Sequence, residues 1–170
     1  MTKARTLADF NTTAIPAAVI TGLSSGGTNA PAFDVKLSSN QDIGDASSAT
    51  VAFNSESIDT DTAFNSSTYR FTPQTAGNYF ITFTLYAYPS TTAATDLGKV
   101  QASIRKNGSG ISAVCDDYGG NDIAQGCVTT SAVVALNGST DYIDFEAEID
   151  VNSGTGMVSH NSRVSGYKLA

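Results

Sequence analysis

Residues 79–88 constrain the fold more than any other stretch, because they predict one long strand that is covered on both faces. Alternate side chains leave a strand on opposite sides. One side is apolar and suits the inside of a sandwich: Tyr79, Ile81, Phe83, Leu85 and Ala87. The other side alternates aromatic residues with threonine, a good strand former: Phe80, Thr82, Thr84, Tyr86 and Tyr88. That second side needs a cover, either the protein's own loops or another subunit. Of the two covers we favour a subunit interface.

The rest of the chain from residue 31 onward also predicts strands. Alternating runs at 32–37, 100–105 and 142–149 predict strands, and so do the short runs at 50–53, 69–71, 133–136 and 164–169. We expect a polar loop at 41–48 and a polar stretch at 54–62. Two Asn-Gly pairs, at Asn107 and Asn137, are strong hairpin signals. No stretch has a sustained helical period. The sequence therefore predicts an all-β jelly-roll sandwich of about ten antiparallel strands at residues 31–170.

Composition agrees with a single β-rich domain and excludes several classes of protein. Of the 170 residues, 15% are charged, 41% are hydrophobic and 15 are glycine, which suits a compact core with polar loops. No apolar run is long enough to span a membrane. The formal net charge of −7 and the scattered basic residues argue against nucleic-acid binding.

Residues 1–30 differ from the rest and predict an extended N-terminal arm. The apolar stretch 14–23 contains a proline and is followed by a Ser/Gly-rich linker at 24–29. Such a segment either covers the domain or docks it to another protein. We favour docking, through Leu7, Phe10, Ile15, Val19, Ile20 and Leu23. The first ten residues lack the apolar run of a secretion signal, so we expect synthesis in a cytoplasm.

The sequence gives no sign of an enzyme. Residues 22–26 match the G-x-S-x-G pattern of a hydrolase nucleophile, and His160 lies downstream. That motif needs a strand before it and a helix after it, whereas Asn29, Ala30 and Pro31 follow here. We interpret the motif as linker. A single histidine cannot anchor a multi-histidine metal site, and we expect no catalytic residues, no metal and no cofactor.

Several motifs after residue 31, taken in order, resemble the globular head domain of the recognition subunit of the first complement component. The matching residues are Ala32-Phe33, 51–54, 69–73, 76–83, 104–108, 136–138 and the closing 164–169, where Val164 and Lys168 depart from the family ending. That family shares a jelly roll with the tumour necrosis factor ligands and is trimeric. The resemblance covers about four-fifths of the chain. It implies a homotrimer with strands like 79–88 near the threefold axis.

The loop between Cys115 and Cys127 is the candidate receptor-facing region. Its exposed polar set would be Asp116, Asp117, Tyr118, Asn121 and Asp122. Reduced thiols are the default for a protein without a signal peptide, whereas a disulfide between Cys115 and Cys127 would stabilise the loop by roughly 3 kcal/mol. Some members of the resembled family hold calcium through such carboxylates, so calcium is a minor alternative, although the spacing misses the EF-hand pattern.

The opening residues 3–10 and 20–23 resemble the start of structural proteins of tailed bacteriophages. The resemblance implies a virion surface protein, made in the host cytoplasm and docked to other virion proteins of the capsid or tail by the arm. Two roles remain open: a trimeric surface appendage or capsid decoration protein, which the short chain favours, and a tail fibre or adhesin that binds a host surface glycan or protein. A free lectin-like binding module is a third alternative. Neither nucleic acid nor membrane insertion is expected.

Overall fold

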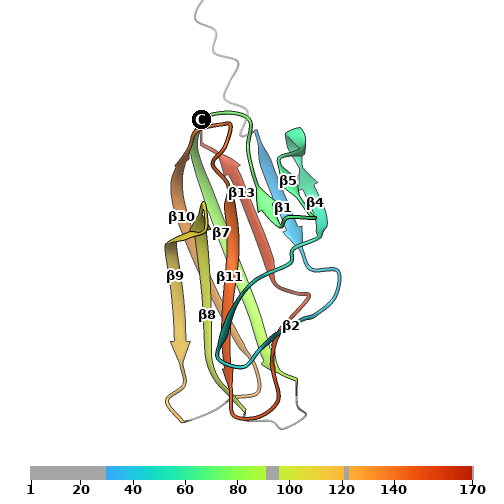
Figure 1. Cartoon of the computed structure of the whole chain (residues 1–170), viewed down its shortest axis with the longest axis vertical. Helices are drawn as coiled ribbons and strands as arrows, with labels where there is room; N and C mark the ends of the chain where they lie inside the picture. The colour runs from blue at the N-terminus through green and yellow to red at the C-terminus, as the bar shows by residue number, and fades with distance from the viewer. Residues whose placement is uncertain (1–29, 91–95, 121–122, 170) are drawn as a thin grey trace, which may run out of the picture.

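The computed structural model describes residues 30–90, 96–120 and 123–169. These residues form thirteen strands in two antiparallel sheets, stacked face to face as a jelly-roll sandwich (Figure 1). In this part of the chain the only helical turn is the 3₁₀ segment Thr60–Thr62, and no helix has the length and hydropathy to cross a bilayer. The predicted fold class is confirmed. The predicted arm, with all six of its docking residues, lies outside the described residues.

The first sheet has seven strands and is organised around the long strand β7 (Gly77–Pro89). One edge of β7 pairs with β10 (Gly126–Leu136) along its whole length. The other edge pairs with β13 (Arg163–Lys168) and then with β12 (Gly156–Val158). Beyond these lie β1 (Ala32–Lys36), β2 (Gln41–Gly44) and β4 (Ser55–Asp59).

The second sheet has six strands and is built around β11 (Ile143–Val151). One neighbour of β11 is β8 (Leu97–Lys106), which forms a hairpin with β9 (Ser109–Asp117). The remaining strands are short: β3 (Ser47–Thr50), β5 (Phe64–Asn65) and β6 (Arg70–Phe71). Because β9 and β10 are edge strands of different sheets, one flank of the sandwich is held by side chains: the Ser112 hydroxyl bonds the Thr130 hydroxyl at 2.7 Å.

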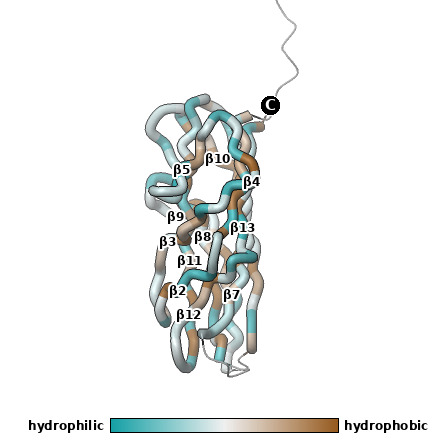
Figure 2. Tube along the Cα trace, turned by 90° about the vertical axis from the view of Figure 1, so that its right-hand side faces the viewer, coloured by the Kyte–Doolittle hydropathy of each residue, from teal (hydrophilic) through white to brown (hydrophobic). Residues whose placement is uncertain are grey.

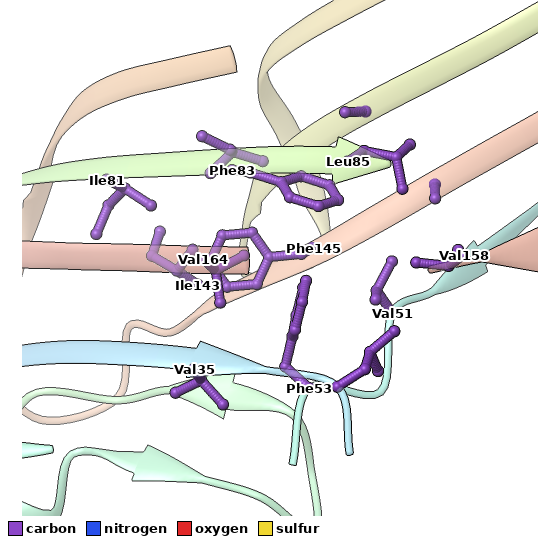
Figure 3. Packing of buried hydrophobic residues seen from close by; sticks show 14 of the residues in the cluster. Val35, Val51, Phe53, Ile81, Phe83, Leu85, Ile143, Phe145, Val158 and Val164 are labelled. Carbon is purple, nitrogen blue, oxygen red and sulfur yellow. The ribbon is translucent and has the colours of Figure 1, made fainter. Parts of the chain in front are cut away.

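The core lies between the two sheets and is rich in phenylalanine (Figure 3). Phe83 and Phe145 meet edge-to-face with ring centroids 5.5 Å apart, and Phe53 packs on both of them. All three rings are fully buried. Burial of one such side chain stabilises the fold by about 1.5–3 kcal/mol, so this cluster fixes the relative position of the sheets.

The outer face of the second sheet carries a ladder of ion pairs. Arg105 donates from Nε and Nη2 to the two carboxylate oxygens of Asp144, at 2.9 and 3.0 Å, and also pairs with Glu146. Lys99 pairs with Glu148 at 2.7 Å. Asp144 is only 4% exposed because Arg105 covers it. The acidic residues of β11 therefore point away from the core, as their alternation predicts. They form ion pairs with the basic residues of β8 on the outer face.

Three local predictions were wrong between residues 41 and 62. The expected loop at 41–48 contains β2 and the start of β3, and the polar stretch 54–62 contains β4. Residues 51–53, expected as a strand, are outside the strands although Val51 and Phe53 are fully buried. The Gln41 side chain replaces the missing strand partner there, accepting from the Ala52 amide at 2.8 Å and donating to the Thr50 carbonyl at 3.0 Å.

The sandwich is elongated and has two different ends (Figure 2). At the terminal end, the first and last described residues meet, since the Lys168 amide donates to the Pro31 carbonyl at 3.0 Å. At the loop end, the β7–β8 and β11–β12 connections meet, because the Ser90 amide donates to the Thr155 carbonyl at 2.8 Å. The chain after β9 lies at the same end, where the Tyr118 amide donates to the Gly98 carbonyl of β8 at 2.9 Å. The chain from the N-terminal arm therefore enters at one end, and these loops lie at the other (Figure 1).

Candidate functional site

The outer face of the first sheet is the strongest candidate for a functional surface. All five residues predicted for a subunit interface lie on it, and all five are half-buried: Phe80, Thr82, Thr84, Tyr86 and Tyr88. Their alternating neighbours on β7 are buried in the core, as the strand pattern predicts. Whether a second subunit contacts this face stays a prediction.

An apolar cluster occupies this face at the terminal end. Phe80 lies directly opposite Tyr167 on β13 and opposite Val133 on β10. The rings of Phe80 and Tyr167 have centroids 5.7 Å apart. Val133 is 64% exposed and Tyr167 is 39% exposed. Sequence reasoning missed both residues, because only the pairing of β7 with distant strands brings them beside Phe80.

Hydroxyl side chains fill the middle of the same face. Thr84 and Thr129 share a hydrogen bond between their Oγ1 atoms at 3.0 Å. Thr82 lies between Ser131 on β10 and Ser165 on β13. Because these side chains are small, they project only a short way from the sheet. Another surface can therefore approach the backbone closely here.

An ion pair lies beside the hydroxyl residues. Arg163 donates from Nε to Oδ2 of Asp34 at 2.6 Å. Asp34 is 8% exposed, and its other oxygen, Oδ1, is buried without a partner among the described residues. The hydrogen bond with Asp34 raises the pKa of Arg163 above its ordinary value, so the arginine is charged under all ordinary conditions.

Two tyrosines extend the face toward the loop end. The Tyr86 hydroxyl donates to Oε1 of Gln125, and Tyr86 lies opposite Cys127 on β10. Tyr88 lies opposite Met157 on β12. The chain's own residues therefore cover the sides of these rings, while their half-exposed surfaces remain available.

The predicted receptor-facing residues are only partly gathered on one exposed surface. Asp116 and Asp117 are exposed at the end of β9, whereas Asn121 and Asp122 lie outside the described residues. Tyr118 packs against the core, close enough that a Cβ added at Gly126 would come within 2.5 Å of its hydroxyl. Burial, with a smaller contribution from Asp116, raises the pKa of Tyr118.

The two cysteines are free and exposed in the structure. Cys127 shares the outer face of the first sheet with Tyr86, whereas Cys115 lies opposite Gln101 in the second sheet. The alternation of burial along β9 and β10 puts the two thiols on the outer faces of different sheets. The disulfide considered from the sequence is therefore absent from this arrangement.

The described residues offer no metal centre and no paired catalytic groups around the histidine. Within them, no three His, Cys, Asp or Glu side chains gather in a way that could hold an ion. His160 is exposed, and its Nδ1 lies 2.9 Å from Oδ1 of Asn40. The serine of the G-x-S-x-G match, Ser24, lies outside the described part of the chain. Calcium binding stays a prediction, because it would involve Asp122, which the structure does not describe.

The two-sheet sandwich is a jelly roll of the kind found in complement and tumour necrosis factor proteins. The C1q domain family model matches residues 32–167. The chain therefore belongs to the C1q domain family.

Solved structures show the same fold at low sequence identity. The zebrafish complement 1qA globular domain has 17% identity and a TM-score of 0.61, with 82% of this chain and 98% of that chain covered. Murine APRIL has 9% identity and a TM-score of 0.59, covering 81% and 98%. The Eiger TNF of S. frugiperda has 11% identity and a TM-score of 0.54, covering 82% and 92%. No curated protein sequence matches the chain.

Proposed function

We propose that this protein is a homotrimeric surface protein of a bacteriophage particle, docked by residues 1–30 and displaying its jelly-roll head. The observation that carries the proposal is the outer face of the first sheet. Val133 and Tyr167 are exposed apolar side chains that lie together with Phe80 on one face of the sheet, and clustered exposed apolar surface of this kind marks an interaction site.

A second copy of the chain is the occupant that fits this face best. The face combines aromatic residues at both ends with small hydroxyl residues between them, an anatomy typical of interfaces with aromatic anchors. Membership of the C1q domain family supports the choice, because domains of this family typically form trimers. The head is non-enzymatic in this proposal, and the interface is its main chemical feature.

The different ends of the sandwich support a docked and projecting arrangement. The arm joins the head at Ala30, beside the last strand, and the loops around Ser90, Tyr118 and Thr155 lie at the far end. A subunit docked through its arm presents those loops outward. The phage setting is supported by the resemblance of residues 3–10 and 20–23 to phage structural proteins.

A receptor-binding role is the second candidate, and the exposed carboxylates of Asp116 and Asp117 at the loop end favour it. An adhesin needs polar groups at the outward end for recognition. If purified head protein binds host cells and Asp116→Ala abolishes the binding, the adhesin role is supported. If neither the wild type nor the variant binds host cells, the decoration role is the better account.

The proposal is tested by following the full chain in particles. Phage particles purified on a density gradient from a culture that makes this protein are probed with an antibody against the head. We expect the chain to co-sediment with DNA-filled particles, and a version lacking residues 1–29 to be absent from them. A chain that stays entirely in the soluble fraction would contradict the virion role and favour a free binding module.

A further inference from the structure

Two cations lie opposite each other on the outer face of the first sheet. Lys36 on β1 is the direct cross-strand neighbour of Arg163 on β13. Like charges in this position repel each other. Among the described residues, the Lys36 ammonium has no hydrogen-bond or ion-pair partner, and the terminal nitrogens of Arg163 have none beyond the Nε contact to Asp34. Because Asp34 already pairs with Arg163, the three groups together carry one net positive charge, on a chain with a net charge of −7.

An unneutralised acidic group lies on the opposite flank of the sandwich. Asp116 is exposed near the end of β9, and its carboxylate has no hydrogen bond or ion pair within the described part of the chain. Asp117 follows it, with Oδ1 accepting from the Gly119 amide at 2.9 Å. In Figure 1, β9 and β10 form one flank, and β1 and β4 form the other.

The strand registers bring the positive and negative groups to similar heights along the sandwich. Arg163 is level with Thr84, and Thr84 is level with Thr129 on β10. Ser112 on β9 is level with Thr130 and Ser131. Counting on from Ser112, Asp116 is level with the start of β10. Its height differs from that of Thr129 by two or three residues, or roughly 7–10 Å along the strands. Long basic side chains reach across such an offset.

A threefold assembly brings two different surfaces of the same chain together, because the contacts of a ring are heterologous. A rotation about an axis along the strands preserves the height of every group. In a ring whose sandwiches stand side by side about such an axis, the flank of β9 in one subunit would meet the flank of β1 in the next with the register worked out above.

We propose that Asp116 pairs with Lys36 and Arg163 of the neighbouring copy and sets the register of the trimer. The inference rests on the homotrimer of the proposed function. It assigns the carboxylate of Asp116 to subunit pairing and gives an ion-pair partner to the Lys36 ammonium, which has none among the described residues. Complementary charges across an interface steer association and exclude wrong registers.

Charge reversal on each side tests the pairing on the full chain. Lys36→Glu and Asp116→Lys are made singly and together, and the trimer dissociation constant is measured by sedimentation at low salt. Each single variant is expected to weaken the trimer about tenfold, because each pair occurs three times per assembly. The double variant, with the charges exchanged, is expected to return to within a few-fold of wild type.

Asp150→Lys is the matched control, because Asp150 is exposed on the second sheet and its reversal changes the net charge by the same amount as Asp116→Lys. We expect it to leave the constant unchanged, and the melting curves of all variants to show that each folds. The pairing is overturned if neither reversal weakens the wild-type trimer, or if the double variant forms a weaker trimer than both single variants. Either result leaves the homotrimer itself standing. A monomeric wild type overturns both the pairing and the homotrimer.

Discussion

Phe80 and Tyr167 lie directly opposite each other on β7 and β13, with ring centroids 5.7 Å apart on the outer face of the first sheet. Their contact joins the central strand to the last strand of the chain outside the core. Because Tyr167 is still 39% exposed, the pair does not complete its own burial. The subunit interface that we propose is centred on this pair and on Val133.

Replacing Tyr167 and Val133 by serine should therefore weaken association much more than it weakens the fold. Truncation of an aromatic anchor at an interface centre costs about 2 kcal/mol or more, which is roughly thirtyfold in a dissociation constant. Sedimentation over a range of concentrations measures the association. Ile111→Ser is the matched control, because Ile111 is 41% exposed on the second sheet. Equal effects of all three changes would contradict the central role of the cluster.

Arg105→Met should destabilise the subunit strongly, because it leaves the carboxylate of Asp144 buried without its partner. Breaking a buried ion pair on one side costs about 3–5 kcal/mol. Lys99→Met is the comparison, since the Lys99–Glu148 pair is more exposed, with side chains 26% and 23% accessible. An exposed pair contributes about 0.2–1 kcal/mol. Urea unfolding of both variants measures the difference, and equal losses would show that burial does not control the effect.

Gly138→Ala tests the turn between β10 and β11. Gly138 has a φ of +71°, and an added Cβ would lie 2.6 Å from the carbonyl carbon of Thr75. We expect a loss of about 2 kcal/mol or more from strain and overlap together. Gly120→Ala is the control, because Gly120 has a φ of +82° with open space around it. A thermal melt in which both variants lose the same stability would exclude the overlap with Thr75.

Glu148→Gln gives a pH-dependent test. The hydrogen bond from Lys99 lowers the pKa of Glu148 below its ordinary value of 4.5. A lowered folded-state pKa contributes stability that is present above the unfolded value and lost as the pH falls through the folded value. The free energy of unfolding of wild type should therefore exceed that of the variant by a few tenths to 1 kcal/mol at about pH 7. The difference should shrink as the pH falls below 4.5 and through the lowered pKa. A difference independent of pH in urea unfolding would contradict the pairing.

Local patterns were sufficient to predict the strands that line the core. The alternation in 79–88 predicts both faces of β7, and Asn107-Gly108 lies at the predicted hairpin between β8 and β9. The hairpin expected at Asn137 was wrong, because β10 and β11 belong to different sheets. Edge strands were harder to predict, because β2, β3 and β4 are short and polar, and their partners are distant in sequence. Nothing local in Ser55–Asp59 indicates that it pairs with β1.

Only part of the candidate site could be predicted from the sequence, again because strand partners are distant along the chain. The residues contributed by β7 follow from its alternation, whereas Val133 and Tyr167 join them only through the order of strands in the sheet. Arg163 and Asp34 are 129 positions apart and meet because β1 and β13 pair. Composition and spacing carry no information about contacts of that range.

The native mass of the full chain in solution tests the central claim most directly. Light scattering over a range of concentrations should give three times the chain mass of 17.5 kDa, and Tyr167→Ser should shift the population toward single chains. A single-chain mass at every concentration would contradict the homotrimer. The outer aromatic residues of β7 would then be covered by the protein's own residues alone.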